Sequence, residues 1–210
     1  MPRKKLIYTS EFPYHIVARS NNREWFKGQL GEVWEIFKEE LLQLNQAYSF
    51  NVHAFVLMSN HYHLVASCSP DFDLGYIMRL LQTRTSNRIN GLSGRINHVY
   101  GGRYKGSLIS DEFYYANVLK YVYRNPVKAG LCNKVEEWPY SNLSEVFAKE
   151  QSGIVTSSHI FEKYLYMNDE EKGSWLNEEF KMDDDERIRK ALTRTVFKLA
   201  QIKSERRVPW

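Results

Sequence analysis

Short stretches in which apolar residues recur at about every second position predict four β-strands within the first 110 residues. They are YHIVAR at 14–19, NVHAFVLM at 51–58, HYHLVAS at 61–67 and RYKGSLI at 103–109. Because only Ser59 and Asn60 separate the second strand from the third, we expect these two strands to form a hairpin.

Segments with apolar residues three or four positions apart lie between and after these strands, and they predict helices at 31–47, 73–91 and 111–125. The last helix is expected to end before Pro126, because proline disfavours helical backbone in the residue that precedes it. The resulting order, β-α-β-β-α-β-α, is close to the ferredoxin-like arrangement. The sequence therefore predicts an α+β fold with an antiparallel sheet.

The composition changes after residue 150. A polar stretch, QSGIVTSS, is followed by an acidic block at 162–186 and then by a basic segment that predicts a helix at 186–204. We therefore divide the chain into a domain of residues 1–150 and a charged, helical C-terminal extension of residues 151–210.

The basic residues are concentrated along the chain, although the net charge of its 210 residues is only +4. Residues 74–134 hold ten basic residues against two acidic ones. An arginine-rich stretch of this kind suggests phosphate contacts, and the alternative is a solvated surface. No apolar run approaches the length that spans a bilayer, and two cysteines are too few for a disulfide framework. We expect a cytoplasmic protein without a membrane segment.

Two histidines, His61 and His63, flank Tyr62 in the third predicted strand. Residues i and i+2 of a strand point to the same face, so both imidazoles are expected to project together. Such a pair can bind a divalent metal ion if a third ligand comes from elsewhere. The motif is short and recurs freely, so an incidental structural role is the alternative.

A second pair of polar side chains, Tyr121 and Asn125, lies one turn apart on the last predicted helix. A tyrosine is a competent nucleophile once its phenol is deprotonated, and an asparagine oxygen is a hard ligand suited to Mg²⁺ or Mn²⁺. In the alternative interpretation, Tyr121 packs in the core and Asn125 caps the helix. Two strand residues and two helix residues could instead converge on one ion.

Several segments together resemble the tyrosine transposases of single-stranded insertion sequences, especially the branch associated with repetitive extragenic palindromes (REP). The matching segments are YHIVARSNNR at 14–23, MSNHYHLVAS at 58–67, GGRYKGSLI at 101–109, YVYRNPVKAGL at 121–131 and WPYSN at 138–142. They follow the family's order across roughly residues 5–145, and no match extends to 151–210. The resemblance implies that residues 1–150 form a ferredoxin-like domain of the HUH type, with a histidine pair and one catalytic tyrosine.

Carried over by position, the resemblance makes His61, His63 and Asn125 ligands of Mg²⁺ or Mn²⁺ and Tyr121 the nucleophile. Tyr123 competes for that role, but it lies about 200° round the helix from Tyr121. The implied activity is metal-dependent cleavage and strand transfer of single-stranded DNA near a hairpin, through a 5′-phosphotyrosine intermediate. Relatives act as dimers or monomers, so we expect a monomer or a homodimer.

Basic side chains near these segments are candidate DNA contacts. They are Arg84, Arg88, Arg103, Lys105 and Arg124. Two other functions remain open at this point. The first is a DNA-hairpin-binding protein, descended from a transposase, that has lost its chemistry. The second is a metal hydrolase that activates water at the histidine pair and forms no covalent product.

Overall fold

The computed structural model describes residues 6–147 and 168–198. The strands are β1 (Tyr14–Arg19), β2 (Asn51–Leu57), β3 (His61–Ser67) and β4 (Lys105–Leu108). The α-helices are α1 (Leu30–Tyr48), α2 (Leu74–Ser93), α3 (Glu112–Lys128), α4 (Leu143–Val146), α6 (Asp169–Asn177) and α7 (Met182–Ala191). Two 3₁₀ turns, η1 (Asn21–Arg23) and η2 (Val135–Glu137), lie between them.

The four strands form one antiparallel sheet in the order β2-β3-β1-β4. The predicted hairpin joins β2 to β3, and the long central strands β1 and β3 pair from Tyr14 with Ala66 to Arg19 with His61. This order confirms the predicted α+β fold with an antiparallel sheet.

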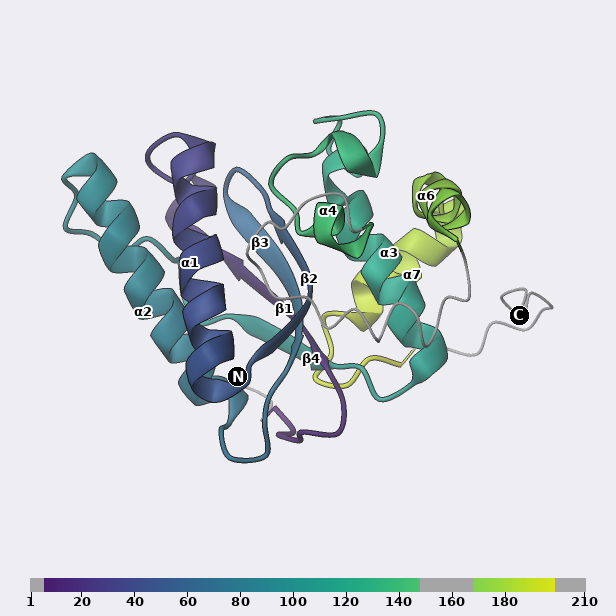
Figure 1. Ribbon diagram of the computed structural model, residues 1–210, viewed down its shortest axis with the longest axis horizontal. Coiled ribbons are helices and arrows are strands. Elements are labelled where there is room, and N and C mark those ends of the chain that lie inside the picture. Colours follow the sequence, from purple (N-terminus) through teal and green to yellow (C-terminus); the bar gives the residue numbers. More distant parts are fainter. Residues whose placement is uncertain (1–5, 148–167, 199–210) are drawn as a thin grey trace.

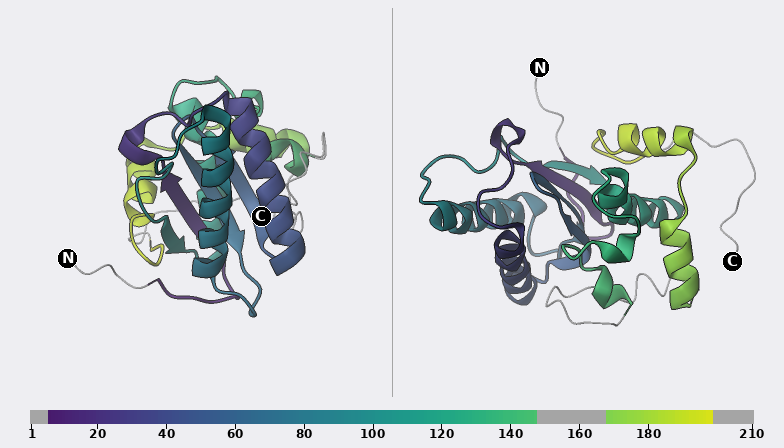
Figure 2. Two further views of the ribbon diagram at one scale, coloured as in Figure 1. Left: turned by 90° about the vertical axis from the view of Figure 1, so that its left-hand side faces the viewer. Right: turned by 90° about the horizontal axis from the view of Figure 1, so that it is seen from above.

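Helices cover both faces of the sheet (Figures 1 and 2). The helices α1 and α2 lie side by side on one face, and α3, α6 and α7 lie on the other. Among the helices of residues 6–147 and 168–198, none combines the length and apolar character needed to cross a membrane.

Alternating side chains of the sheet build two separate cores. Tyr62 and Leu64 of β3 pack in the cluster under α1 and α2, whereas Val65 packs in the cluster under α3. His61 and His63 have the parity of Val65 along the strand, so they face α3. The sheet therefore presents its histidine pair to the helix that carries Tyr121.

The helix α3 continues past Pro126 to Lys128, so the predicted end at Pro126 is wrong. Proline removes the N–H that would donate to the carbonyl of Val122 one turn earlier. The Asn125 side chain supplies a substitute, because its Nδ2 donates to that carbonyl oxygen at 3.3 Å and to the carbonyl oxygen of Tyr121 at 2.8 Å. The asparagine thus compensates locally for the missing donor.

The C-terminal part of the described chain packs against α3 rather than standing apart from it. Leu176 of α6 and Ile188 of α7 are buried in the α3-side core, and Phe197 also lies there. Phe197 N donates to the carbonyl of Leu108 in β4 at 2.8 Å, so this segment also touches the sheet edge. Within the described residues, α6 and α7 lie in the predicted extension, and α7 ends at Ala191, so the predicted helix at 186–204 is not continuous. Residues 148–167 and 199–210 lie outside the described residues, and the division at residue 150 stays a prediction.

A buried histidine of β2, His53, links the sheet to α3. Its Nδ1 lies 2.8 Å from the Tyr115 hydroxyl and its Nε2 lies 2.9 Å from Ser67 Oγ. Burial lowers the pKa of His53 from 6.5 to about 3. The folded protein therefore holds this imidazole in its neutral form.

The lowered pKa of His53 predicts a stability that falls in acid. Below pH 6.5 the imidazole of His53 binds a proton in the unfolded chain but not in the folded protein. Stability is therefore lost as the pH falls from 6.5 towards 3. The loss is about 1.4 kcal/mol per pH unit, or roughly 2 kcal/mol at pH 5. Urea unfolding at pH 7 and pH 5 should show His53→Gln losing less stability than the wild type. An equal loss in the two proteins would contradict this assignment.

Candidate active site

The histidine pair lies at the end of β3, next to the turn that joins it to β2. The turn is closed by a hydrogen bond from Met58 N to the carbonyl of His61 at 2.8 Å. The ring centroids of His61 and His63 are 5.1 Å apart. The structure therefore brings the two imidazoles together on one face, as the i, i+2 spacing indicates.

The Nδ1 atom of each imidazole is already engaged. Nδ1 of His61 lies 2.7 Å from Oδ1 of Asn60, whose Nδ2 donates to the carbonyl of Arg23 at 2.8 Å. Because an amide oxygen only accepts, the proton sits on Nδ1 of His61 and its Nε2 carries a lone pair. Burial lowers the pKa of His61 to about 4 and that of His63 well below its ordinary value. Both rings are therefore neutral near pH 7.

A third histidine, His15 of β1, completes this arrangement. Its Nε2 lies 3.0 Å from Nδ1 of His63, and the two rings stack with centroids 5.3 Å apart. The His15 side chain is buried, and burial lowers its pKa to about 3. Sequence reasoning left this residue out of the candidate site. Its signal was the alternation of β1, which places His15, Val17 and Arg19 on one face.

Tyr121 of α3 lies against these rings. Its ring meets His63 edge-on at a centroid distance of 5.9 Å and His15 at 6.2 Å. Tyr121 is 8% exposed, and burial raises its pKa to about 12. The phenol is therefore protonated at neutral pH and needs help to lose its proton. The structure thus joins the tyrosine and the histidine pair that the sequence placed about 60 residues apart.

Tyr123, the competing tyrosine, occupies different surroundings. It is 1% exposed, and its hydroxyl donates to Oδ1 of Asn142 at 3.0 Å. The same Oδ1 accepts from the backbone N–H of Phe55 at 2.7 Å. The Tyr123 side chain therefore ties α3 to the segment before α4 and to β2.

Asn125 lies one turn after Tyr121 on α3 and is partly buried. Its Nδ2 donates to the carbonyl oxygens of Tyr121 and Val122, whereas its Oδ1 accepts no hydrogen bond from the described residues. The amide nitrogen therefore supports the helix, and the role of the oxygen as a metal ligand stays a prediction.

An exposed arginine, Arg19, ends β1 beside the histidine pair. It pairs across the strands with His61, and it shares the face of His15. Its positive charge adds to the lowering of the pKa of His61. It also offsets part of the rise that burial causes in the pKa of Tyr121. From α7, Asp185 raises the pKa of Tyr121 and Arg189 lowers it, so the C-terminal helix also reaches this region. Sequence reasoning passed over Arg19 too.

The five basic residues expected to contact DNA fall into different environments. Arg84 lies 3.6 Å from the buried carboxylate of Glu40, and Arg88 pairs with Glu39 and Glu40 at 2.6 and 3.2 Å. Both guanidinium groups therefore join α2 to α1.

The Arg124 guanidinium is buried, and it donates to the carbonyls of Leu176 and Asn177 in α6. Arg103 and Lys105 are exposed, before and at the start of β4. Of the five, these two are the most accessible to a DNA strand.

A divalent metal ion would find a small donor set here. In the described ranges, no group of three or more His, Cys, Asp or Glu side chains has the arrangement of a metal site. The candidate set instead combines two neutral imidazoles with an amide oxygen. Nε2 of His61 and Nε2 of His63 have no hydrogen-bond partner among residues 6–147 and 168–198. The amide oxygen suits a hard divalent cation such as Mg²⁺ or Mn²⁺, and the neutral imidazoles can bind a divalent metal ion as well.

Comparison with known proteins agrees with this fold. A protein of Haemophilus influenzae described as a REP-associated tyrosine transposase is 26% identical over 156 residues, which cover 67% of this chain and 86% of that protein. A solved structure, a REP-associated tyrosine transposase bound to a REP hairpin, superposes with a TM-score of 0.61 at 19% identity. The match covers 71% of this chain and 87% of the other, and it shows the same fold. Residues 8–125 match the family of IS200-like transposases. The chain therefore belongs to the IS200-like transposase family.

Proposed function

We propose that the protein cleaves and rejoins single-stranded DNA next to a hairpin, through a covalent 5′-phosphotyrosine at Tyr121. The observation that carries this proposal is the contact of the Tyr121 ring with His63 and His15, at 5.9 and 6.2 Å. The hairpin substrate is suggested by the similar solved structure, which is a REP-associated transposase bound to a REP hairpin. This activity amounts to DNA transposition.

In the proposed site, His61, His63 and Asn125 would hold Mg²⁺ or Mn²⁺, the two histidines with nitrogen and the asparagine with its amide oxygen. When bound, the cation polarises the scissile phosphate and offsets the charge that develops in the transition state. The neutral state of both imidazoles supports this role, because a protonated ring has no lone pair to offer.

Cleavage and rejoining are the same exchange of bonds at phosphorus, run in opposite directions. The Tyr121 oxygen attacks phosphorus and forms the phosphotyrosine bond, while the bond to the 3′ oxygen of the neighbouring nucleotide breaks. The phenol gives up its proton and the leaving 3′ oxygen gains one. A 3′ hydroxyl from a second strand then attacks the phosphotyrosine and releases Tyr121. Arg19, exposed beside His61, is placed to donate to a non-bridging phosphate oxygen.

His15 acts in this proposal as a positioning residue. Its Nε2, 3.0 Å from Nδ1 of His63, accepts a hydrogen bond from the Nδ1–H group and so fixes both the tautomer and the orientation of the ligand ring.

Removing this support should weaken metal binding without removing a ligand. We expect His15→Phe, which keeps an aromatic ring but removes the hydrogen-bond acceptor, to lower the affinity for Mn²⁺ by about 10–100-fold. His15→Gln can still accept from Nδ1 of His63 and should restore part of that loss. Calorimetric titration with Mn²⁺ measures both effects. A purely structural role for His15 would leave the affinity of both variants at the wild-type value.

The direct test of the proposed function uses purified protein and a 3′-labelled single-stranded DNA that contains a hairpin. Label that migrates with the protein on a denaturing gel in Mg²⁺ or Mn²⁺, and is absent with a chelator, supports a covalent intermediate. Cleavage without such a band would point to activated water and contradict the role of Tyr121. Binding without cleavage, across a library of hairpins, would favour a hairpin-binding protein that has lost its chemistry.

A further inference from the structure

The turn between β2 and β3, which precedes the histidine pair, is bonded to the loop that follows β1. This loop consists of residues 20–26, and we call it the β1 loop. Ser20 N donates to the carbonyl of Asn60 at 2.8 Å. The Asn60 side chain adds a second bond, from its Nδ2 to the carbonyl of Arg23 at 2.8 Å. Asn60 therefore contacts the β1 loop through both its backbone and its side chain.

The backbone of the β1 loop is strained at its centre. Asn22 and Arg23 have φ angles of 54° and 60°, which lie in the left-handed region. An asparagine enters this region with little difficulty, whereas an arginine seldom does. Strain of this kind persists only where the surrounding structure imposes it, and it concentrates at functional sites. Here the strained residue Arg23 is the one whose carbonyl accepts from Asn60.

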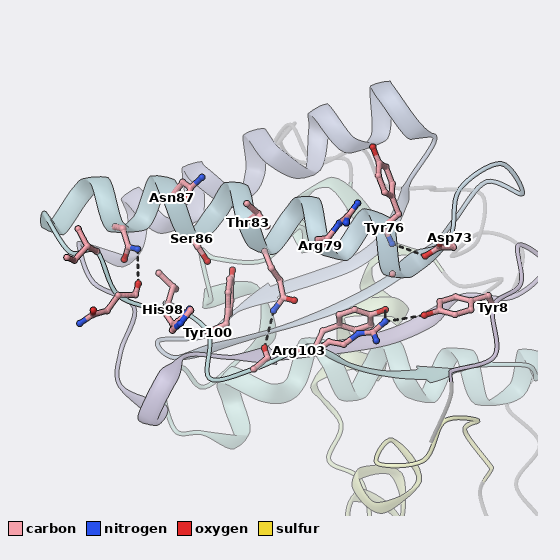
Figure 3. A pocket seen from close by; sticks show the side chains of 18 residues that line it. Tyr8, Asp73, Tyr76, Arg79, Thr83, Ser86, Asn87, His98, Tyr100 and Arg103 are labelled. Atoms are coloured by element: carbon pink, nitrogen blue, oxygen red, sulfur yellow. Dashed lines mark hydrogen bonds between the residues drawn. The ribbon is translucent and has the colours of Figure 1, made fainter. Parts of the chain in front are cut away.

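Contacts on both sides hold the β1 loop in this conformation. Phe26 is buried in the core under α1 and α2, and its N donates to the carbonyl of Ser59 at 2.7 Å. On the other side, Asn21 N donates to the carbonyl of Val99 at 2.8 Å, in the segment between α2 and β4. Figure 3 shows Tyr100 of that segment next to α2. The surroundings therefore impose the strained turn.

The carbonyl of Arg23 determines how the Asn60 amide is oriented, because a backbone carbonyl only accepts hydrogen bonds. Nδ2 of Asn60 must face Arg23, so Oδ1 faces His61 and lies 2.7 Å from its Nδ1. An amide oxygen also only accepts, so Nδ1 of His61 is the donor and its Nε2 keeps a lone pair. The tautomer of His61 thus follows, through Asn60, from a backbone carbonyl of the β1 loop.

We propose that Asn60 is a positioning residue for His61, and that the strained turn at Arg23 holds the Asn60 amide in the orientation this role requires. Asn60 keeps the proton of His61 on Nδ1 and fixes the ring, so the other nitrogen is free to bind a divalent cation. His61 thereby gains a support from the β1 loop, as His63 gains one from His15. This inference rests on the proposed function, since it assumes that His61 is a metal ligand.

The first test determines the tautomer of His61 in the metal-free protein at neutral pH. Long-range proton–nitrogen NMR spectra of the histidine-labelled protein show which ring nitrogen carries the proton. We expect the proton on Nδ1 in the wild type. Asn60→Ala removes the acceptor, so the proton should move at least in part to Nε2. Asn60→Asp keeps an accepting oxygen, so the proton should stay on Nδ1.

The second test is calorimetric titration with Mn²⁺. We expect Asn60→Ala to lower the affinity by about 10–100-fold, as expected when the support of a metal-ligating histidine is lost. Asn60→Asp should restore part of this loss, because it keeps the acceptor for His61 but not the donor to Arg23. The control is Ser59→Ala in the same turn, where the β1 loop contacts a backbone carbonyl. It should bind Mn²⁺ as the wild type does.

The strained turn is tested by two variants that both remove the Arg23 side chain. Arg23→Gly relieves the strain, because glycine adopts positive φ freely, so the tautomer of His61 and the affinity for Mn²⁺ should stay at their wild-type values. Arg23→Val places a β-branched residue at positive φ and should lower the affinity by about ten-fold. Because both variants lose the same charge, the difference between them reports on the backbone alone.

Two results would overturn the proposal. One is a proton on Nε2 of His61 in the wild type, and the other is an unchanged tautomer and Mn²⁺ affinity in Asn60→Ala. The NMR signals of His53, which is buried between Tyr115 and Ser67, show whether each variant is folded.

Neither measurement involves DNA or attack by Tyr121. A missing covalent band, with the tautomer and the Mn²⁺ affinity still dependent on Asn60, would therefore contradict the strand-transfer activity and leave the positioning role in place.

Discussion

Replacing Tyr121 by phenylalanine is expected to abolish the covalent protein–DNA product. The substitution removes only the attacking oxygen and keeps the ring that packs against His63 and His15. Loss of a nucleophile lowers the rate by a factor of at least about 10³. Hairpin binding, measured by anisotropy in a chelator, should stay within about two-fold of the wild-type value, since it needs no attack on phosphorus.

The matched comparison is Tyr123→Phe, two residues along the same helix. It removes the hydrogen bond from the Tyr123 hydroxyl to Asn142, so it should lower the free energy of unfolding by about 1–3 kcal/mol. The covalent product should still form. A product that persists in Tyr121→Phe and disappears in Tyr123→Phe would move the nucleophile to Tyr123.

Removing a metal ligand is the second change with a large expected effect. We expect His61→Ala to lower the affinity for Mn²⁺ by more than about 100-fold, because it deletes one of three donors rather than a neighbour of a donor. Cleavage should be lost at Mn²⁺ concentrations that saturate the wild type. The measurement is calorimetric titration of Mn²⁺, followed by the gel assay at the same metal concentration.

The control for that titration is Tyr121→Phe, which keeps all three donors. It should bind Mn²⁺ as the wild type does while forming no covalent product, so the two variants separate metal binding from attack. If His61→Ala bound Mn²⁺ as tightly as the wild type, the histidine pair would not be the metal site.

Much of the fold could be predicted from the sequence because its patterns are local. Period-two alternation locates the strands, and the two-residue gap at Ser59 and Asn60 indicates the hairpin. The predicted end of α3 at Pro126 was wrong for a physical reason, because the Asn125 side chain replaces the hydrogen-bond donor that Pro126 lacks. The last helix was also misplaced, because α7 begins within the acidic block and packs Ile188 against α3.

Only those residues of the candidate site that share one strand or one helix could be predicted together from the sequence. His61 and His63 share a strand, and Tyr121 and Asn125 share a helix. The contact of His15 with His63 depends instead on the register between β1 and β3, which no local pattern encodes. The ion pairs of Arg84 and Arg88 likewise depend on how α2 packs against α1.

The central claim is that Tyr121 forms the bond to DNA, and peptide mass spectrometry tests it most directly. The wild-type protein would be incubated with a hairpin substrate and Mn²⁺, treated with nuclease and protease, and searched for peptides that carry a nucleotide. Our account predicts the nucleotide on Tyr121, joined through a 5′ phosphate. A nucleotide on Tyr123 or on any other residue, or cleaved DNA with no modified peptide, would contradict it.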